Sequence, residues 1–210
     1  MRRALVVGLN DYPGFPLRGC VNDANSIASV LESHGDGSPN FAIKLVTEAS
    51  ELTRPRLRAA IEAVFGQECD LALFYFSGHG TVGGSGGKLV TSDFEQYDEG
   101  VSMDEILNFA NQSKAREKII LLDCCFSGQF GTPVGGSGTT QLCEGVSVLT
   151  ACRKSEPAIE SDGRGVFTSL VVDALKGGAS DLRGFITPGG IYAYVDQALG
   201  PFGPLACTRQ

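Results

Sequence analysis

The chain has 210 residues, of which 42% are hydrophobic, which is enough for one substantial core, so we expect a single domain over residues 1–210. A net charge of −7 without a run of Lys or Arg argues against nucleic acid or an anionic membrane surface as a partner. No apolar stretch reaches the length of a membrane span, and the run after Arg2 and Arg3 is too short for a signal peptide, which predicts a cytoplasmic protein.

Short apolar runs alternate with amphipathic segments along the first half of the chain. We expect strands at 4–10, 42–47 and 71–78, with helices between them at 23–34 and 53–65. This alternation is typical of βαβ units, in which helices cover both faces of a parallel sheet.

The middle of the chain adds a hairpin and a helix. A short hairpin is expected around Lys88 to Asp93. The following helix is expected to end near Asn111, and Ser102 with Glu105 three residues later predicts a capping box at its start.

The last third predicts two more strands and two more helices. The strands are "KIILLDCC" and "GVSVLTAC", and the helices are "VFTSLVVDALKGG" and a segment with Thr187 as N-cap and Pro188 in the first turn. The predicted fold class is therefore α/β, with a mostly parallel sheet of about six strands flanked by helices on both faces.

Polar residues interrupt two apolar runs at their C-terminal ends, in "FYFSGHG" and "LLDCCFSG". Ligands of open α/β sheets bind beyond these ends. Strand alternation places Asp123 and Cys125 on one face and Cys124 on the other, provided that the strand extends past Asp123. The seven cysteines include no CxxC, so a disulfide framework or a zinc site is not indicated, and one reactive thiol at Cys125 is favoured over Cys124.

A nucleophilic thiol needs a neighbouring imidazole, and the chain offers His34 and His79. His34 follows an expected helix end, where a solvated capping role is expected. His79 lies between two glycines after a buried strand, where the backbone can turn sharply and approach a ligand. A plain turn histidine is the alternative interpretation of His79.

The paired motifs "YFSGHG" and "LLDCCFSG" resemble those of caspase-like cysteine peptidases, most closely the metacaspase branch, and "ALVVGLNDY" and "LRGCVNDA" extend the resemblance. The resemblance implies a caspase-like three-layer sandwich and peptide hydrolysis through a thioacyl-enzyme. Cys125 would be the nucleophile, His79 would handle the proton, and the N–H groups of Cys125 and Gly80 would hold the oxyanion. No cofactor is required for this chemistry.

The resemblance also implies a pocket for the residue before the cleaved bond, formed by Asp23, Asp123, Cys20 and Ser77. Two carboxylates attract a guanidinium or ammonium group, which predicts cleavage after Arg or Lys. A helix N-cap is the alternative for Asp23. Arg18 is the residue nearby that could support cleavage after Asp instead.

The loop over residues 129–145 contains no Lys or Arg, so an enzyme specific for basic residues cannot cut itself there. The nearest later candidates are Arg153, Lys154 and Arg164. We therefore expect control by an activating protein or protease, or by ordering of this loop around a substrate.

Two further alternatives stay open. Asp93 and Asp104 resemble calcium-binding positions of some metacaspases, but Met103 and Thr132 stand where further acids are expected, so a solvated acidic loop is the preferred interpretation. The rival to an active peptidase is a catalytically silent caspase-like scaffold that binds partners without turnover.

Overall fold

The computed structural model describes residues 1–83, 86–96, 98–124, 142–151, 160–161 and 163–199. Four residues named above, Cys125, Thr132, Arg153 and Lys154, lie outside the described residues.

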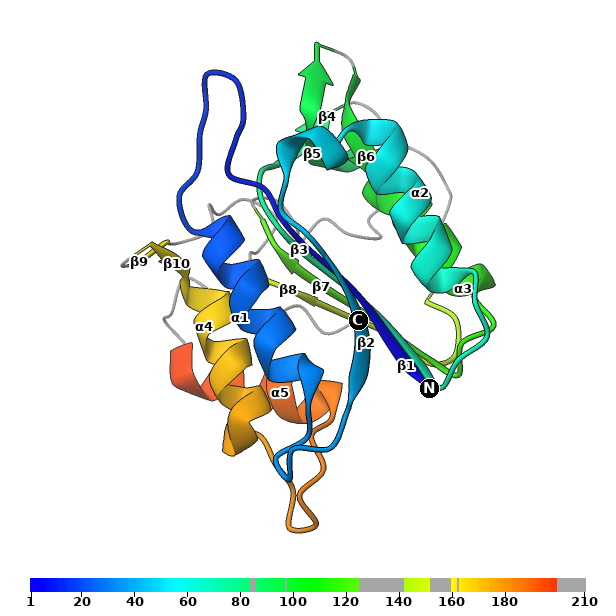
Figure 1. Cartoon of the computed structure of the whole chain (residues 1–210), viewed down its shortest axis with the longest axis vertical. Helices are drawn as coiled ribbons and strands as arrows, with labels where there is room; N and C mark the ends of the chain where they lie inside the picture. Colours follow the sequence, from blue (N-terminus) through cyan, green and yellow to red (C-terminus); the bar gives the residue numbers. More distant parts are fainter. Residues whose placement is uncertain (84–85, 97, 125–141, 152–159, 162, 200–210) are drawn as a thin grey trace.

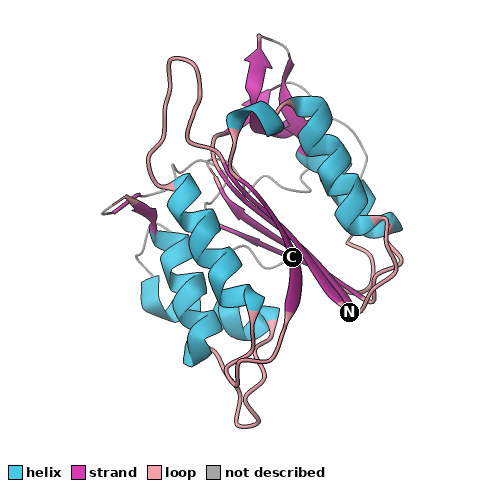
Figure 2. Ribbon diagram, in the orientation of Figure 1, coloured by secondary structure: helices cyan, strands magenta, loops and turns pink. Residues whose placement is uncertain are grey.

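A parallel five-stranded sheet runs through the middle of the molecule (Figures 1 and 2). Its strands, in spatial order, are β2 (Phe41–Val46), β1 (Arg2–Gly8), β3 (Leu71–Ser77), β7 (Glu117–Asp123) and β8 (Val146–Thr150). The register pairs Gly8 with Ser77 and Ser77 with Asp123, so the carboxyl ends of three strands are level. The predicted α/β class with a mostly parallel sheet is confirmed, with five strands in the part that the structure describes.

Helices cover both faces of this sheet (Figure 1). One face carries α1 (Cys20–Glu32), α4 (Val166–Asp173) and α5 (Pro188–Leu199), and the other carries α2 (Arg54–Phe65) and α3 (Met103–Gln112). Strand alternation separates the two cores: Leu121 of β7 packs under α1 and α4, whereas Leu122 packs under α2 and α3. Within the described ranges, no helix is long and apolar enough to cross a bilayer.

A second, antiparallel sheet follows β3, with the strand order β4 (Gly80–Gly83), β5 (Gly86–Glu95) and β6 (Asp98–Ser102). The segment from Lys88 to Asp93, predicted to be a hairpin, is part of the single strand β5. A hairpin of β9 (Glu160–Ser161) and β10 (Arg164–Gly165) leads into α4 (Figure 2). Short 3₁₀ and π turns, η1 (Ala49–Glu51) and η3 (Ala174–Gly178), follow β2 and α4.

The two predicted helix caps had different outcomes. Thr187 accepts a 3.1 Å hydrogen bond at Oγ1 from the Gly190 amide, which confirms it as the N-cap of α5. Ser102 precedes α3 but its side chain makes no cap hydrogen bond. The predicted capping box is wrong, because Glu105 instead accepts a 2.7 Å hydrogen bond from Arg58 of α2.

The start of α2 is capped from another element: the Arg54 amide donates to Oδ1 of Asp93 in β5, at 2.8 Å. A carboxylate here satisfies a helix N-terminal N–H and complements the helix dipole. We expect Asp93→Ala to lower the free energy of unfolding by about 1 kcal/mol, measured in EDTA so that calcium does not contribute. Denaturant unfolding measures this, with the exposed neighbour Glu95→Ala as the control. Equal stability of the two variants in EDTA would contradict the capping role.

Candidate active site

The predicted pocket residues meet at the carboxyl edge of the sheet. Ser77 ends β3, Asp123 ends β7, and Asp23 lies in the first turn of α1. The Ser77 hydroxyl donates to Asp23 Oδ2 at 3.3 Å. Asp23 is 2% exposed, Asp123 5%, and Cys20, the first residue of α1, 4%. Four residues from three separate segments of the sequence thus lie buried at one edge of the sheet.

The alternative interpretation of Asp23 as an N-cap is wrong. Helix α1 begins at Cys20, three residues before Asp23, and its N-cap is Gly19. The early start places Asp23 inside the first turn with its side chain facing the sheet edge, where it contacts Ser77.

The start of α4 supplies hydrogen bonds to both carboxylates. The Gly165 amide donates to Asp23 Oδ1 and Oδ2 at 3.1 and 3.0 Å. Thr168 donates to Asp123 Oδ2 from its hydroxyl at 2.5 Å and from its amide at 3.3 Å. The positive end of the α4 dipole therefore lies against the two negative charges and stabilises them.

Tyr75 extends this network from inside β3. Its hydroxyl lies 2.6 Å from Thr168 Oγ1, and since the Thr168 proton goes to Asp123, Tyr75 is the donor. Burial raises the pKa of Tyr75 well above its usual value, and the charges of Asp123 and Asp23 raise it further, so the phenol keeps the proton that it donates.

Gly165 is required by packing. A Cβ built on it would overlap Oδ2 of Asp123 and lie 3.0 Å from Oδ2 of Asp23. Both carboxylates therefore flank one backbone atom, and no larger residue fits between them without displacing one. The sequence alone does not indicate Gly165, Thr168 and Tyr75 as site residues, because no local motif marks them.

His79 lies in the short connection between β3 and β4, between Gly78 and Gly80, the first residue of β4. Its Nε2 lies 2.8 Å from the carbonyl oxygen of Phe15. A carbonyl can only accept, so Nε2 carries the proton and Nδ1 is the nitrogen that can take one. His34 lies beyond the other end of α1, exposed to solvent.

Of the two adjacent cysteines, Cys124 is the last residue of a described segment and Cys125 lies outside it. Cys124 is fully buried in the apolar layer under α2 and α3, together with Leu122. Asp123 faces the opposite layer and contacts Thr168 of α4. The strand alternation predicted for Asp123 and Cys124 is therefore confirmed, whereas Cys125 lies outside the described residues and its role stays a prediction.

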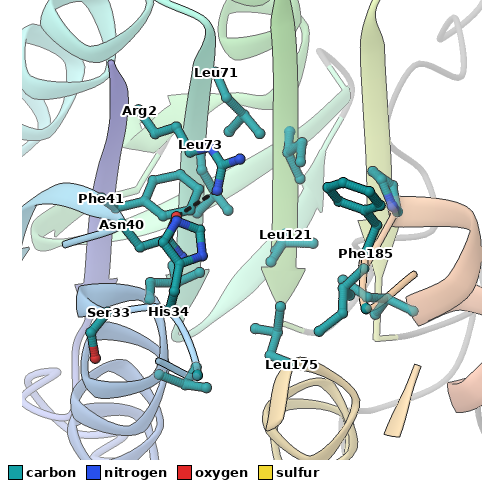
Figure 3. A pocket seen from close by; sticks show the side chains of 18 residues that line it. Arg2, Ser33, His34, Asn40, Phe41, Leu71, Leu73, Leu121, Leu175 and Phe185 are labelled. Atoms are coloured by element: carbon teal, nitrogen blue, oxygen red, sulfur yellow. Dashed lines mark hydrogen bonds between the residues drawn. The ribbon is translucent and has the colours of Figure 1, made fainter. Parts of the chain in front are cut away.

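A cavity of about 350 Å³ lies away from this site (Figure 3). Leu71, Leu73 and Leu121 of the sheet line it, together with Arg2 and His34. Because Arg2 and Leu71 begin their strands, the cavity lies at the amino ends of the strands. Ligands of open α/β sheets bind at the carboxyl ends, so the opposite edge is the candidate substrate site.

The acids predicted as a calcium alternative have other contacts or lie apart. Asp93 caps α2, and Asp104 lies in the first turn of α3. Within the described part of the chain, no group of three His, Cys, Asp or Glu residues is placed to hold a metal ion. A solvated acidic loop stays the prediction for these acids, and calcium binding stays the alternative to it.

The geometry of the sheet edge agrees with comparisons to known proteins, in which the caspase domain family matches residues 1–194. The chain belongs to the caspase family. Metacaspase-8 of Arabidopsis thaliana is 28% identical over 149 residues, which cover 60% of this chain and 37% of that protein. The crystal structure of protein GSU0716 from Geobacter sulfurreducens shares the caspase-like fold with a TM-score of 0.67, at 16% identity over 96% of this chain and 90% of that one.

The caspase domain family is a family of cysteine peptidases, which makes a peptidase the candidate function of this domain. The predicted relationship to metacaspases is confirmed. The chain spans little more than a third of the length of the plant metacaspase, 37% of it.

Proposed function

We propose that the protein is a cysteine endopeptidase that uses a His79–Cys125 dyad and cleaves proteins after Arg or Lys. The observation that carries this proposal is the pair of buried carboxylates, Asp23 and Asp123, at the sheet edge from which His79 projects. A catalytically silent scaffold has no need to keep two acids in so costly an environment.

The proposed chemistry uses the orientation of the imidazole. The Phe15 carbonyl holds Nε2–H, so Nδ1 takes the proton of the Cys125 thiol, and the thiolate attacks the scissile carbonyl. The amide N–H groups of Cys125 and Gly80 bind the oxyanion, each contributing about 3 kcal/mol to the barrier reduction. His79 then protonates the leaving amine, and water hydrolyses the thioacyl-enzyme.

Specificity follows from charge. Asp23 and Asp123 accept hydrogen bonds from the neutral donors Gly165, Thr168 and Ser77, and carboxylates attract a substrate guanidinium or ammonium group. An acidic side chain would be repelled. Arg18, the residue that could support cleavage after Asp, is exposed on the loop before α1.

The same contacts support regulated activity. Asp23 and Asp123 are held by the start of α4 and are at most 5% exposed, so a substrate side chain reaches them only when the surroundings of Gly165 rearrange. An activating protein or protease would act by favouring that rearrangement.

Paired fluorogenic peptides that differ only in the last residue, Arg, Lys, Gln or Asp, test the proposal, each with calcium and with EDTA. We expect the Arg and Lys peptides to be hydrolysed at least about 100-fold faster than the Asp peptide, because like charges in a buried site cost several kcal/mol. Cleavage after Asp, or self-cleavage within residues 129–145, would overturn the basic specificity. A folded protein that cleaves no peptide, even after limited proteolysis, would favour the scaffold.

A further inference from the structure

Tyr12 lies in the loop between β1 and α1 and is only 3% exposed. Its hydroxyl accepts a 2.9 Å hydrogen bond from the His79 amide and donates to the Val90 carbonyl at 3.3 Å. Its ring meets the His79 imidazole edge to face, with centroids 4.6 Å apart and an interplanar angle of 62°. One side chain thus contacts both the backbone and the ring of the proposed catalytic histidine.

Tyr12 is also connected to the group that holds the imidazole. Its carbonyl accepts a 3.1 Å hydrogen bond from the Phe15 amide, and the Phe15 carbonyl binds His79 Nε2. The Val90 amide donates to the His79 carbonyl at 2.9 Å, so the Tyr12 hydroxyl bridges two residues that are also hydrogen-bonded to each other. Tyr12 therefore contacts His79 and both of the residues, Phe15 and Val90, that hydrogen-bond to it.

The glycine before the histidine is explained by the same tyrosine. A Cβ on Gly78 would overlap the Tyr12 hydroxyl and the Phe76 ring. Positive φ occurs at other glycines, such as Gly86 at 98°, and not at Gly78 or Gly80. The backbone before His79 therefore needs glycine for the close approach of Tyr12 rather than for a left-handed turn.

We propose that Tyr12 is a positioning residue for His79: its hydroxyl fixes the histidine backbone while its carbonyl orders the Phe15 carbonyl that orients the ring. The catalytic part of this inference rests on the proposed peptidase function. Burial raises the pKa of Tyr12 far above its usual value, so the hydroxyl stays protonated and donates to Val90 throughout the working pH range.

Loss of the hydroxyl has a defined consequence. Tyr12→Phe keeps the ring but leaves the His79 amide and the Val90 carbonyl without the partner that Tyr12 supplies. The end of β3 is then free to shift, and the Phe15 hydrogen bond that selects the Nε2–H tautomer weakens.

The first measurement is steady-state kinetics of Tyr12→Phe on an Arg peptide. We expect kcat to fall about 10- to 100-fold with KM within about 3-fold, because small misplacement of a catalytic group slows the chemical step. Ile61→Val, on the buried face of α2, is the control, since it lowers stability without touching His79. A Tyr12→Phe variant with the kcat of Ile61→Val would overturn the inference.

The second measurement does not depend on turnover. The chain has two histidines, so their imidazole ¹⁵N signals are readily assigned with variants. We expect the wild type to show the Nε2–H form at His79, Tyr12→Phe to show a mixture of tautomers, and His34 to be unchanged. If the wild type cleaves no peptide, the proposed function fails while this experiment still decides the role of Tyr12, and unchanged His79 signals in Tyr12→Phe would reject it.

Discussion

Replacing Cys125 by Ala is expected to lower kcat/KM for an Arg peptide by more than about four orders of magnitude, because the proposed acyl intermediate forms on its thiol. Cys124→Ala is expected to retain activity within about 3-fold. The structure gives the reason for the difference: Cys124 packs fully buried with Leu122 under α2 and α3, on the face opposite to Asp123 and Thr168.

Kinetics and alkylation together measure this prediction. The wild type and Cys124→Ala should be inactivated by iodoacetamide with loss of one thiol that Cys125→Ala lacks, in addition to the exposed Cys143. The cost of Cys124→Ala should appear as a loss of about 1 kcal/mol in the free energy of unfolding, since a buried sulfur is replaced by a void. Activity that survives Cys125→Ala but not Cys124→Ala would reject the assignment of the nucleophile.

The sheet was predictable from the sequence because its signal is local. Each central strand is an apolar run that ends in a polar residue, and period-two alternation placed Leu122 and Cys124 on one face and Asp123 on the other. Local patterns also explain why the predicted capping box was wrong. The motif of Ser102 and Glu105 is a proper capping box in sequence, but a charged partner on another helix, Arg58, takes the glutamate.

The candidate site depends on contacts that no local pattern contains. Gly165 meets Asp23 across 142 positions of sequence, Thr168 meets Tyr75 across 93, and Tyr12 meets His79 across 67. A motif can indicate that His79 does chemistry, but the residues that orient it or neutralise a carboxylate are ordinary tyrosines, threonines and glycines. Their roles appear only when the strands are in register.

Asp123→Asn tests whether the buried carboxylates exist for substrate or for folding. The amide is nearly isosteric and its oxygen can still accept from Thr168, so the contacts to α4 are kept and the negative charge is lost. We expect kcat/KM for the Arg peptide to fall about 100- to 1,000-fold, the cost of removing one member of a buried charge pair. The matched Gln peptide should change much less, so the preference for Arg should collapse.

The same substitution, Asp123→Asn, should not lower the stability of the fold. Asp23 and Asp123 lie on either side of Gly165, and neutralising one of two buried like charges removes repulsion and a desolvation cost. Thermal unfolding of Asp123→Asn should therefore show a midpoint equal to or above that of the wild type, and Asp196→Asn, exposed on α5, should change neither property. A variant that unfolds earlier yet keeps its Arg preference would show that the carboxylate serves to anchor α4. Higher stability together with lost selectivity would instead show that the Asp123 charge destabilises the free protein and serves to bind the substrate.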